Sequence, residues 1–292
     1  MTTEPPPKRP RGLGAKKAES NGDKAEDAVE EIMFECGEGA DEMTQLLSMW
    51  TAAKKSFWEQ QQEVEEGSSE KVELLLSAVI NEANRIASDC GEWTDELANI
   101  FGEAMILQSH YAESEDEAIK YLQMALDVCP EDSQIYLMAQ GVKARSAQSL
   151  KDDKSRALAL YHLDRIFGAS EVDPLFIFQT LEQDDIPLIV ELHLAKLAVK
   201  VLVETVDEDS EEGDSSMEEF LPLISRLGEK FTENLTHGGL TRCAQFHLSA
   251  GVIYGFCGKE AEEEKSYQQA KKFYGKLEEL FGEQVPEEVK SL

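Results

Sequence analysis

The stretch of sequence that decides the fold covers residues 116–130 and reads DEAIKYLQMALDVCP. Its apolar residues recur at the three- and four-residue spacing of an amphipathic helix. Ala118 and Ala125 are small enough to let a second helix approach closely, and Pro130 cannot continue a helix. The stretch therefore predicts one member of a closely packed helical pair, followed by a turn.

A second stretch near the C-terminus has the same kind of pattern. Small and aromatic residues stand at the corresponding intervals, at Gly251, Tyr254, Gly258, Tyr267 and Ala270. The two stretches match the tetratricopeptide repeat of about 34 residues, although Glu263 stands where that repeat usually has alanine. We therefore predict an all-α fold, namely an antiparallel helical-repeat solenoid of the tetratricopeptide-like kind.

Helical spacing of apolar residues extends over most of the chain from Asp41 onward. Three apolar stripes come first, at 46–58, 72–86 and 97–111. Further helices are expected at roughly 115–128, 132–148, 152–167, 174–182, 185–205, 217–235, 239–257 and 259–281. Short loops between them favour antiparallel neighbours.

Composition divides the chain into three parts. Residues 1–40 are rich in Pro, Gly, Lys and Glu without sustained periodicity, which predicts a disordered basic and acidic arm. Residues 41–285 form the predicted helical-repeat domain, which an acidic loop at 207–219 interrupts. Residues 286–292 are a short tail.

The charge of the chain is strongly negative and unevenly distributed. The chain has 28 basic and 59 acidic residues, a formal net charge of −31. Residues 1–24 carry +3, which leaves −34 on the remainder. Such a surface repels nucleic-acid phosphate and anionic membranes, so we expect neither as a direct partner. The apolar segment 186–206 is expected to be a buried helix, because Glu191 and Lys196 interrupt it.

No motif of the chain indicates catalysis. The sequence contains no GxxxxGK[ST], HExxH or GxSxG pattern. His162 and Asp164 have the H-x-D form of an iron site, but on a helix two such residues point about 200° apart. We therefore predict a protein that is not an enzyme and has no cofactor or metal. The alternative is an enzyme that uses iron at His162 and Asp164. His193, in the most apolar helix, is expected to be a hydrogen-bonded core residue.

The richer signals concern interaction with other proteins. Residues 5–11 read PPPKRPR, and a nuclear import receptor would recognise Lys8, Arg9 and Arg11 together with Lys16 and Lys17. This predicts localisation in the nucleus, with the cytoplasm as a second compartment. The alternative is an unspecific solubilising tail.

Two further groups of residues are candidate interaction or modification sites. Trp50, Phe57 and Trp58 share one stripe, which is either part of the core or a docking surface for another protein. Ser215 and Ser216 each have a glutamate three residues later, which makes them candidates for phosphorylation by an acid-directed kinase. The positions that bind a carboxylate in chaperone-tail adaptors fall near Glu103 and Leu107, which cannot hold an anion.

The order of several short motifs resembles the fungal enhancer-of-translation-termination family. They are KRPRGLG at 8–14, a Leu-x-x-x-Trp pattern at Leu46 and Trp50, VINEANR at 79–85, LANIF at 97–101 and the segment 118–134. The resemblance implies an all-α repeat fold, nuclear residence and no catalysis. It also implies binding to a 2-oxoglutarate- and iron-dependent prolyl-hydroxylase-like dioxygenase, with effects on translation termination or oxygen-responsive regulation. The alternative is a general tetratricopeptide-like scaffold, or an acidic chaperone for basic client proteins.

Overall fold

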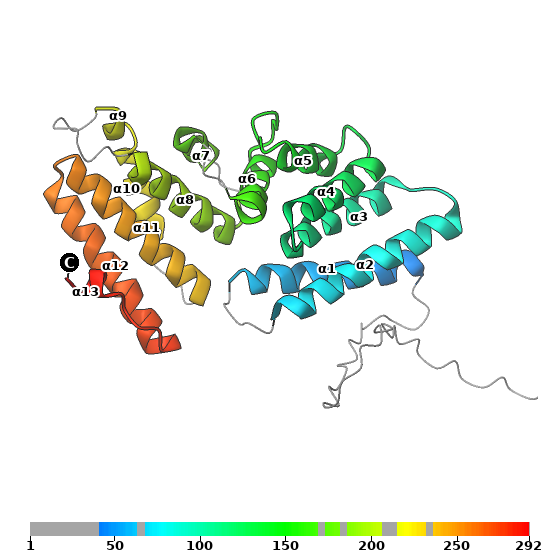
Figure 1. The fold of residues 1–292 in the computed structure, drawn as a ribbon, viewed down its shortest axis with the longest axis horizontal. Helices are drawn as coiled ribbons and strands as arrows, with labels where there is room; N and C mark the ends of the chain where they lie inside the picture. Colours follow the sequence, from blue (N-terminus) through cyan, green and yellow to red (C-terminus); the bar gives the residue numbers. More distant parts are fainter. Residues whose placement is uncertain are drawn as a thin grey trace, which may run out of the picture.

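The computed structural model describes residues 41–62, 68–168, 173–181, 186–205, 215–231 and 236–291. All regular secondary structure within these ranges is helical, so the prediction of an all-α protein is confirmed (Figure 1). The predicted arm at 1–40 lies outside the described residues. None of the helices in the described ranges is long and apolar enough to cross a membrane.

The helices follow one another closely along the chain. They are α1 (Glu42–Gln60), α2 (Ser68–Cys90), α3 (Asp95–Gln108), the 3-10 helix η1 (Ser109–Tyr111), α4 (Glu115–Val128), α5 (Gln134–Lys143), α6 (Asp153–Phe167), α7 (Pro174–Thr180), α8 (Leu188–Thr205), α9 (Ser215–Glu218), α10 (Leu221–Lys230), α11 (His237–Phe256), α12 (Glu260–Phe281) and α13 (Glu287–Ser291). From α1 to α6 each helix packs on the next, and α11 packs on both α8 and α12.

Several helices begin where the sequence supplies a capping side chain. The side chains of Asp41, Thr94, Ser114, Ser133 and Asp152 each accept a hydrogen bond from the backbone N–H three residues later. Such a cap satisfies one of the backbone donors that a helix leaves unpaired at its start. The starts of α1, α3, α4, α5 and α6 are therefore encoded locally.

Two of the expected helices are shorter than the sequence pattern predicts. α5 ends at Lys143 and not near residue 148, because Arg145 takes a left-handed conformation with φ of 56° and Ser146 N–H bonds back to the Gly141 carbonyl. The expected helix 217–235 is divided into α9 and α10. Pro222 lies in the first turn of α10, where a proline is tolerated but cannot extend a preceding helix.

The start of α11 is bonded to the end of α1 (Figure 1). Gly238 N–H donates to the Gln62 carbonyl at 2.7 Å, and Arg242 Nη1 donates to the Gln61 carbonyl at 3.2 Å. The Tyr161 hydroxyl donates to Gln61 Oε1 at 2.8 Å. A Cβ at position 238 would lie 2.9 Å from the Gln62 carbonyl oxygen, so this approach requires glycine.

The second repeat-like stretch brings Gly251 of α11 against Tyr267 of α12. A Cβ at Gly251 would lie 2.4 Å from the Tyr267 ring, whereas a Cβ at Gly275 of α12 would meet no atom within 4 Å. We expect Gly251→Ala to lower the free energy of unfolding by about 1–3 kcal/mol through overpacking. Gly275→Ala is the control and should raise it by about 0.5–1 kcal/mol, because glycine is unfavourable within a helix. Urea denaturation of both variants measures the difference, and equal shifts would contradict the packing argument.

Candidate functional site

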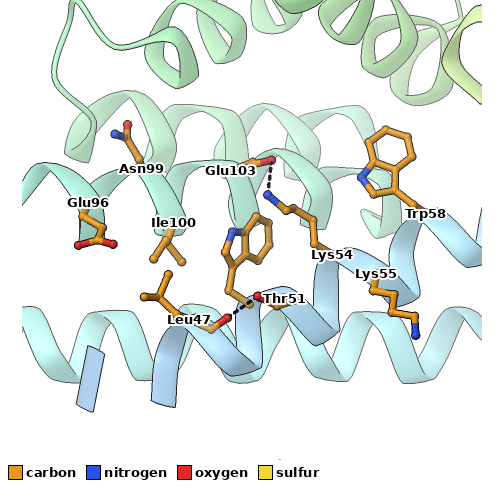
Figure 2. A pocket seen from close by; sticks show the side chains of 10 residues that line it. Leu47, Thr51, Lys54, Lys55, Trp58, Glu96, Asn99, Ile100 and Glu103 are labelled. Carbon is orange, nitrogen blue, oxygen red and sulfur yellow. Dashed lines mark hydrogen bonds and ion pairs between the residues drawn. The ribbon is translucent and has the colours of Figure 1, made fainter. Parts of the chain in front are cut away.

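A groove of about 840 Å³ runs between α1 and α3. The α1–α3 groove is lined by Leu47, Trp50, Thr51, Lys54, Lys55, Trp58, Glu96, Asn99, Ile100 and Glu103 (Figure 2). Its α1 side carries aromatic rings and lysines, while its α3 side carries carboxylates and an amide. It is open to solvent along its length, which suits an extended segment of another molecule better than a small molecule.

Helical periodicity places the lining residues on one face of each helix. On α1, residues 47, 50, 51, 54 and 58 are spaced by three or four positions, and so are 96, 99, 100 and 103 on α3. A neighbouring stripe of α1, with Leu46, Ala53 and Phe57 fully buried, packs into the core. The core stripe therefore fixes the orientation of α1 and turns the adjacent stripe towards the groove.

An ion pair crosses the middle of the groove. Lys54 Nζ lies 3.5 Å from Glu103 Oε1 and 4.9 Å from the centroid of the Trp50 ring (Figure 2). Burial raises the pKa of Glu103, and the Lys54 ammonium partly opposes that rise. Lys54 is therefore held by a carboxylate on one helix and by an aromatic face on its own helix.

One polar atom of the groove is buried without a partner. Asn99 Oδ1 accepts no hydrogen bond from any described residue, and it is shielded from solvent. An unpaired buried oxygen of this kind costs free energy until it finds a donor. Asn99 precedes Glu103 by four residues, so both acceptors lie on the same face of α3.

The three candidate docking aromatics have different surroundings. Phe57 is completely buried, so it belongs to the core, and the docking interpretation is wrong for this residue. Trp50 is 5% exposed and Trp58 is half-buried, and both line the α1–α3 groove. The sequence predicted one stripe for all three residues. In the structure Phe57 instead shares the buried face of α1 with Leu46 and Ala53, and therefore points into the core.

A buried polar group, the histidine cluster of His110, Tyr161, His162, Asp164 and His193, lies next to the end of α1. His110 Nε2 lies 2.7 Å from His162 Nδ1, and His193 Nε2 lies 2.6 Å from Asp164 Oδ2. The His193 side chain is 5% exposed, so its prediction as a hydrogen-bonded core residue is confirmed. The cluster joins η1, α6 and α8 by side-chain hydrogen bonds.

The histidines of this cluster are neutral at physiological pH. Burial lowers the pKa of His162 to about 3 and that of His110 to well below its usual value of 6.5. Burial also lowers the pKa of His193, although Asp164 opposes that change. Neutral imidazoles joined pairwise in this way hold helices together, and none of them is poised to exchange a proton near pH 7.

The H-x-D pair does not converge on one point. His162 bonds to His110, whereas Asp164 bonds to His193 on α8. Among the described residues, no three His, Cys, Asp or Glu side chains are arranged to hold a metal ion. The geometry therefore gives no support to the alternative of an iron enzyme at His162 and Asp164.

The remaining candidates lie at or beyond the limits of the described chain. Lys8, Arg9, Arg11, Lys16 and Lys17 lie outside the described residues, as does the segment 207–214 of the expected acidic loop. Ser215 and Ser216 open the short helix α9, so the end of the expected loop 207–219 is helical.

Sequence reasoning missed the pairing of Lys54 with Glu103 and of His110 with His162. Each pair joins residues of separate helical segments, about fifty positions apart, and no spacing rule connects them. A weak signal for the first pair existed in the lysine four residues after Trp50, because such a lysine can reach back over the ring.

Comparison with protein-family models, with curated proteins and with solved structures gives no match for this chain.

Proposed function

We propose that the chain is a non-catalytic nuclear adaptor whose helices form a tetratricopeptide-like solenoid. Its helical body binds a 2-oxoglutarate- and iron-dependent prolyl-hydroxylase-like dioxygenase and thereby affects translation termination or oxygen-responsive regulation. The observation that carries the binding role is the open α1–α3 groove, with its two tryptophans and mixed charges. The identity of the partner comes from the resemblance of residues 8–150 to the fungal family.

Affinity purification of the full chain from cells, with washing at high salt, tests this proposal. We expect stoichiometric recovery of the dioxygenase with the unaltered chain. Leu47→Arg should abolish recovery, because it places a long charged side chain at an exposed apolar position of the groove. The matched control is Leu280→Arg at an exposed position of α12, which should leave recovery unchanged. Equal recovery with both variants would remove the groove from the proposal.

A second function is favoured by the net charge of −31. An acidic helical scaffold attracts basic client proteins through exposed charges, which salt screens over about 10 Å at 0.1 M. Recovery of only basic proteins, and their loss as salt rises, would support this chaperone-like role. It would also remove the dioxygenase from the proposed function.

Nuclear import is the next expectation. Replacing Lys8, Arg9 and Arg11 with alanine should abolish nuclear accumulation of a fluorescent fusion, because an import receptor binds such basic side chains through acidic pockets. Fluorescence microscopy of living cells measures the ratio of nuclear to cytoplasmic signal.

A control with the same loss of charge separates import from a general charge effect. Replacing the exposed lysines Lys265, Lys271 and Lys272 of α12 with alanine should leave the ratio unchanged. If both triple variants remain nuclear, the basic arm is not the import signal.

A further inference from the structure

We propose that the α1–α3 groove is a receptor for an arginine side chain on a segment of a partner protein, and that Lys54 occupies the guanidinium position until the partner binds. This inference rests on the proposed protein-binding function and specifies its site and the chemistry of its ligand. It does not depend on which protein carries the arginine.

The first argument is the arrangement of groups around Lys54. The Trp50 ring lies on one side of the ammonium at 4.9 Å and the Glu103 carboxylate on the other at 3.5 Å. An aromatic face and a carboxylate across a shallow groove are the two surfaces that bind a planar cation best. The chain therefore already holds a cation of its own at the place where a ligand cation would fit.

Lys54 is weakly held, so a ligand can displace it. Its side chain is 39% exposed and that of Glu103 is 31% exposed. Partly exposed lysine–carboxylate pairs contribute little to stability, because solvent screens them and the flexible side chain loses entropy. The lysine can turn into solvent at small cost, since its side chain is already partly exposed.

The α3 side of the groove has more acceptor capacity than Lys54 uses. The raised pKa of Glu103 shows that the lysine does not fully compensate the burial of the carboxylate. A guanidinium has five N–H donors in a planar fork, so it can bond both oxygens of the Glu103 carboxylate at once. An ammonium on a partner lysine lacks that planar reach.

Charge complementarity also favours a cationic partner. The chain carries −31 overall, and this field attracts basic segments before they reach the groove. Leu47 and Ile100 border the groove on either side, and Trp58 lies further along α1 (Figure 2). The expected ligand is therefore a short segment with a central arginine and apolar neighbours.

Fluorescence anisotropy with the full chain at neutral pH tests the inference. The probe is a short labelled peptide with one central arginine flanked by leucines, and the control peptide has citrulline, its neutral isostere, in place of arginine. We expect the arginine peptide to bind roughly tenfold tighter, because a desolvated cation is attracted both by an aromatic ring and by a carboxylate, whereas citrulline is neutral. Equal binding of the two peptides would overturn the proposal.

Three single variants distinguish the roles of the groove residues. Lys54→Met keeps the stem, removes the competing cation and should tighten binding of the arginine peptide by about three- to tenfold. Glu103→Gln should weaken it by about tenfold. The matched control is Lys200→Met on α8, because Lys200 is exposed, lies outside the groove lining and pairs with Glu204, and it should change affinity less than about twofold. If Lys54→Met binds the arginine peptide no more tightly than the unaltered chain, Lys54 does not occupy the guanidinium position.

Two further outcomes separate this inference from its alternatives. If alanine at Lys8, Arg9 and Arg11 tightens peptide binding as Lys54→Met does, the chain's own arm occupies the groove, and the proposal of a partner arginine fails. If no peptide binds while the dioxygenase is still recovered from cells, the arginine receptor fails and the proposed function stands. Circular dichroism melting of each variant confirms that the helices remain folded.

Discussion

Phe57→Ala is expected to lower the free energy of unfolding by about 3–5 kcal/mol. Phe57 is completely buried, and its ring centroid lies 5.1 Å from those of Trp58 and His110 and 6.3 Å from that of Tyr111. Truncation removes the apolar contacts of the ring and leaves a cavity bordered by side chains that are held by hydrogen bonds. Those neighbours cannot collapse into the space without breaking the His110–His162 contact.

Urea denaturation at neutral pH measures this loss. The control is Leu47→Ala, which removes an apolar side chain from the same helix where it is 38% exposed, and it should cost less than about 1 kcal/mol. The experiment also decides between the two interpretations of the aromatic stripe. A docking residue would weaken partner recovery without a change in stability, whereas a core residue lowers stability itself.

The second large effect is a loss of stability in mild acid. Burial lowers the pKa of His162 to about 3 and that of His247, a 5% exposed residue of α11, to about 4, from a usual value of 6.5. Between the folded pKa of each histidine and the usual value of 6.5, the unfolded chain therefore binds more protons than the folded chain. The stability that each histidine contributes is complete above about pH 6.5 and is lost as the pH falls towards the folded pKa. Each of these two histidines should lower the free energy of unfolding by about 2 kcal/mol when the pH falls from 7 to 5.

The groups around these histidines determine how the experiment is interpreted. His110 and His193 add to the same loss, since burial lowers their pKa values, and Arg165 lowers the pKa of His110 further. Hydrogen bonds lower the pKa values of Asp41 and Asp152, so these carboxylates titrate below the chosen window. Burial raises the pKa of Glu103, so this carboxyl changes stability in the opposite direction as the pH falls, and substitution of the histidines themselves is needed to assign their share of the loss.

Urea denaturation at pH 7, 6 and 5 measures the loss, and non-titrating substitutions assign it. His247→Leu should reduce the fall in unfolding free energy between pH 7 and pH 5 by about 2 kcal/mol, whatever its effect at pH 7. His162→Phe should reduce the fall by a similar amount. A wild-type stability that is the same at pH 7 and pH 5 would show that these histidines are not buried as described.

Local sequence rules predicted most of the helices but not all of their ends. Apolar periodicity and capping side chains such as Asp41, Thr94 and Ser114 mark their helices clearly, because both act within a few residues. The end of α5 was missed because Arg145, and not glycine, takes the left-handed conformation there. The break before α10 had a visible signal in Pro222 that the apolar pattern of the segment concealed.

The candidate site was predictable only in part. The aromatic stripe with Trp50 and Trp58 was found, since both residues belong to one helix. The α1–α3 groove itself also requires α3, a different segment of the chain, which supplies Glu103 and Asn99. Contacts between segments follow from packing of the whole chain, and a periodic pattern within one helix contains no information about them.

The bonds that join the end of α1 to later segments affect the order in which the chain can mature during synthesis. Gln61 is bonded to Tyr161 and to Arg242, which follow it by 100 and 181 residues. The ribosome synthesises the N-terminal part first, so α1 can pack on α2 and α3 early. The hydrogen bonds at the end of α1 form only after α11 has been synthesised. The helix α1 leaves the ribosome early but is among the last of the described helices to be completed, and a nascent chain that stalls before α11 exposes an unfinished edge to chaperones and proteases.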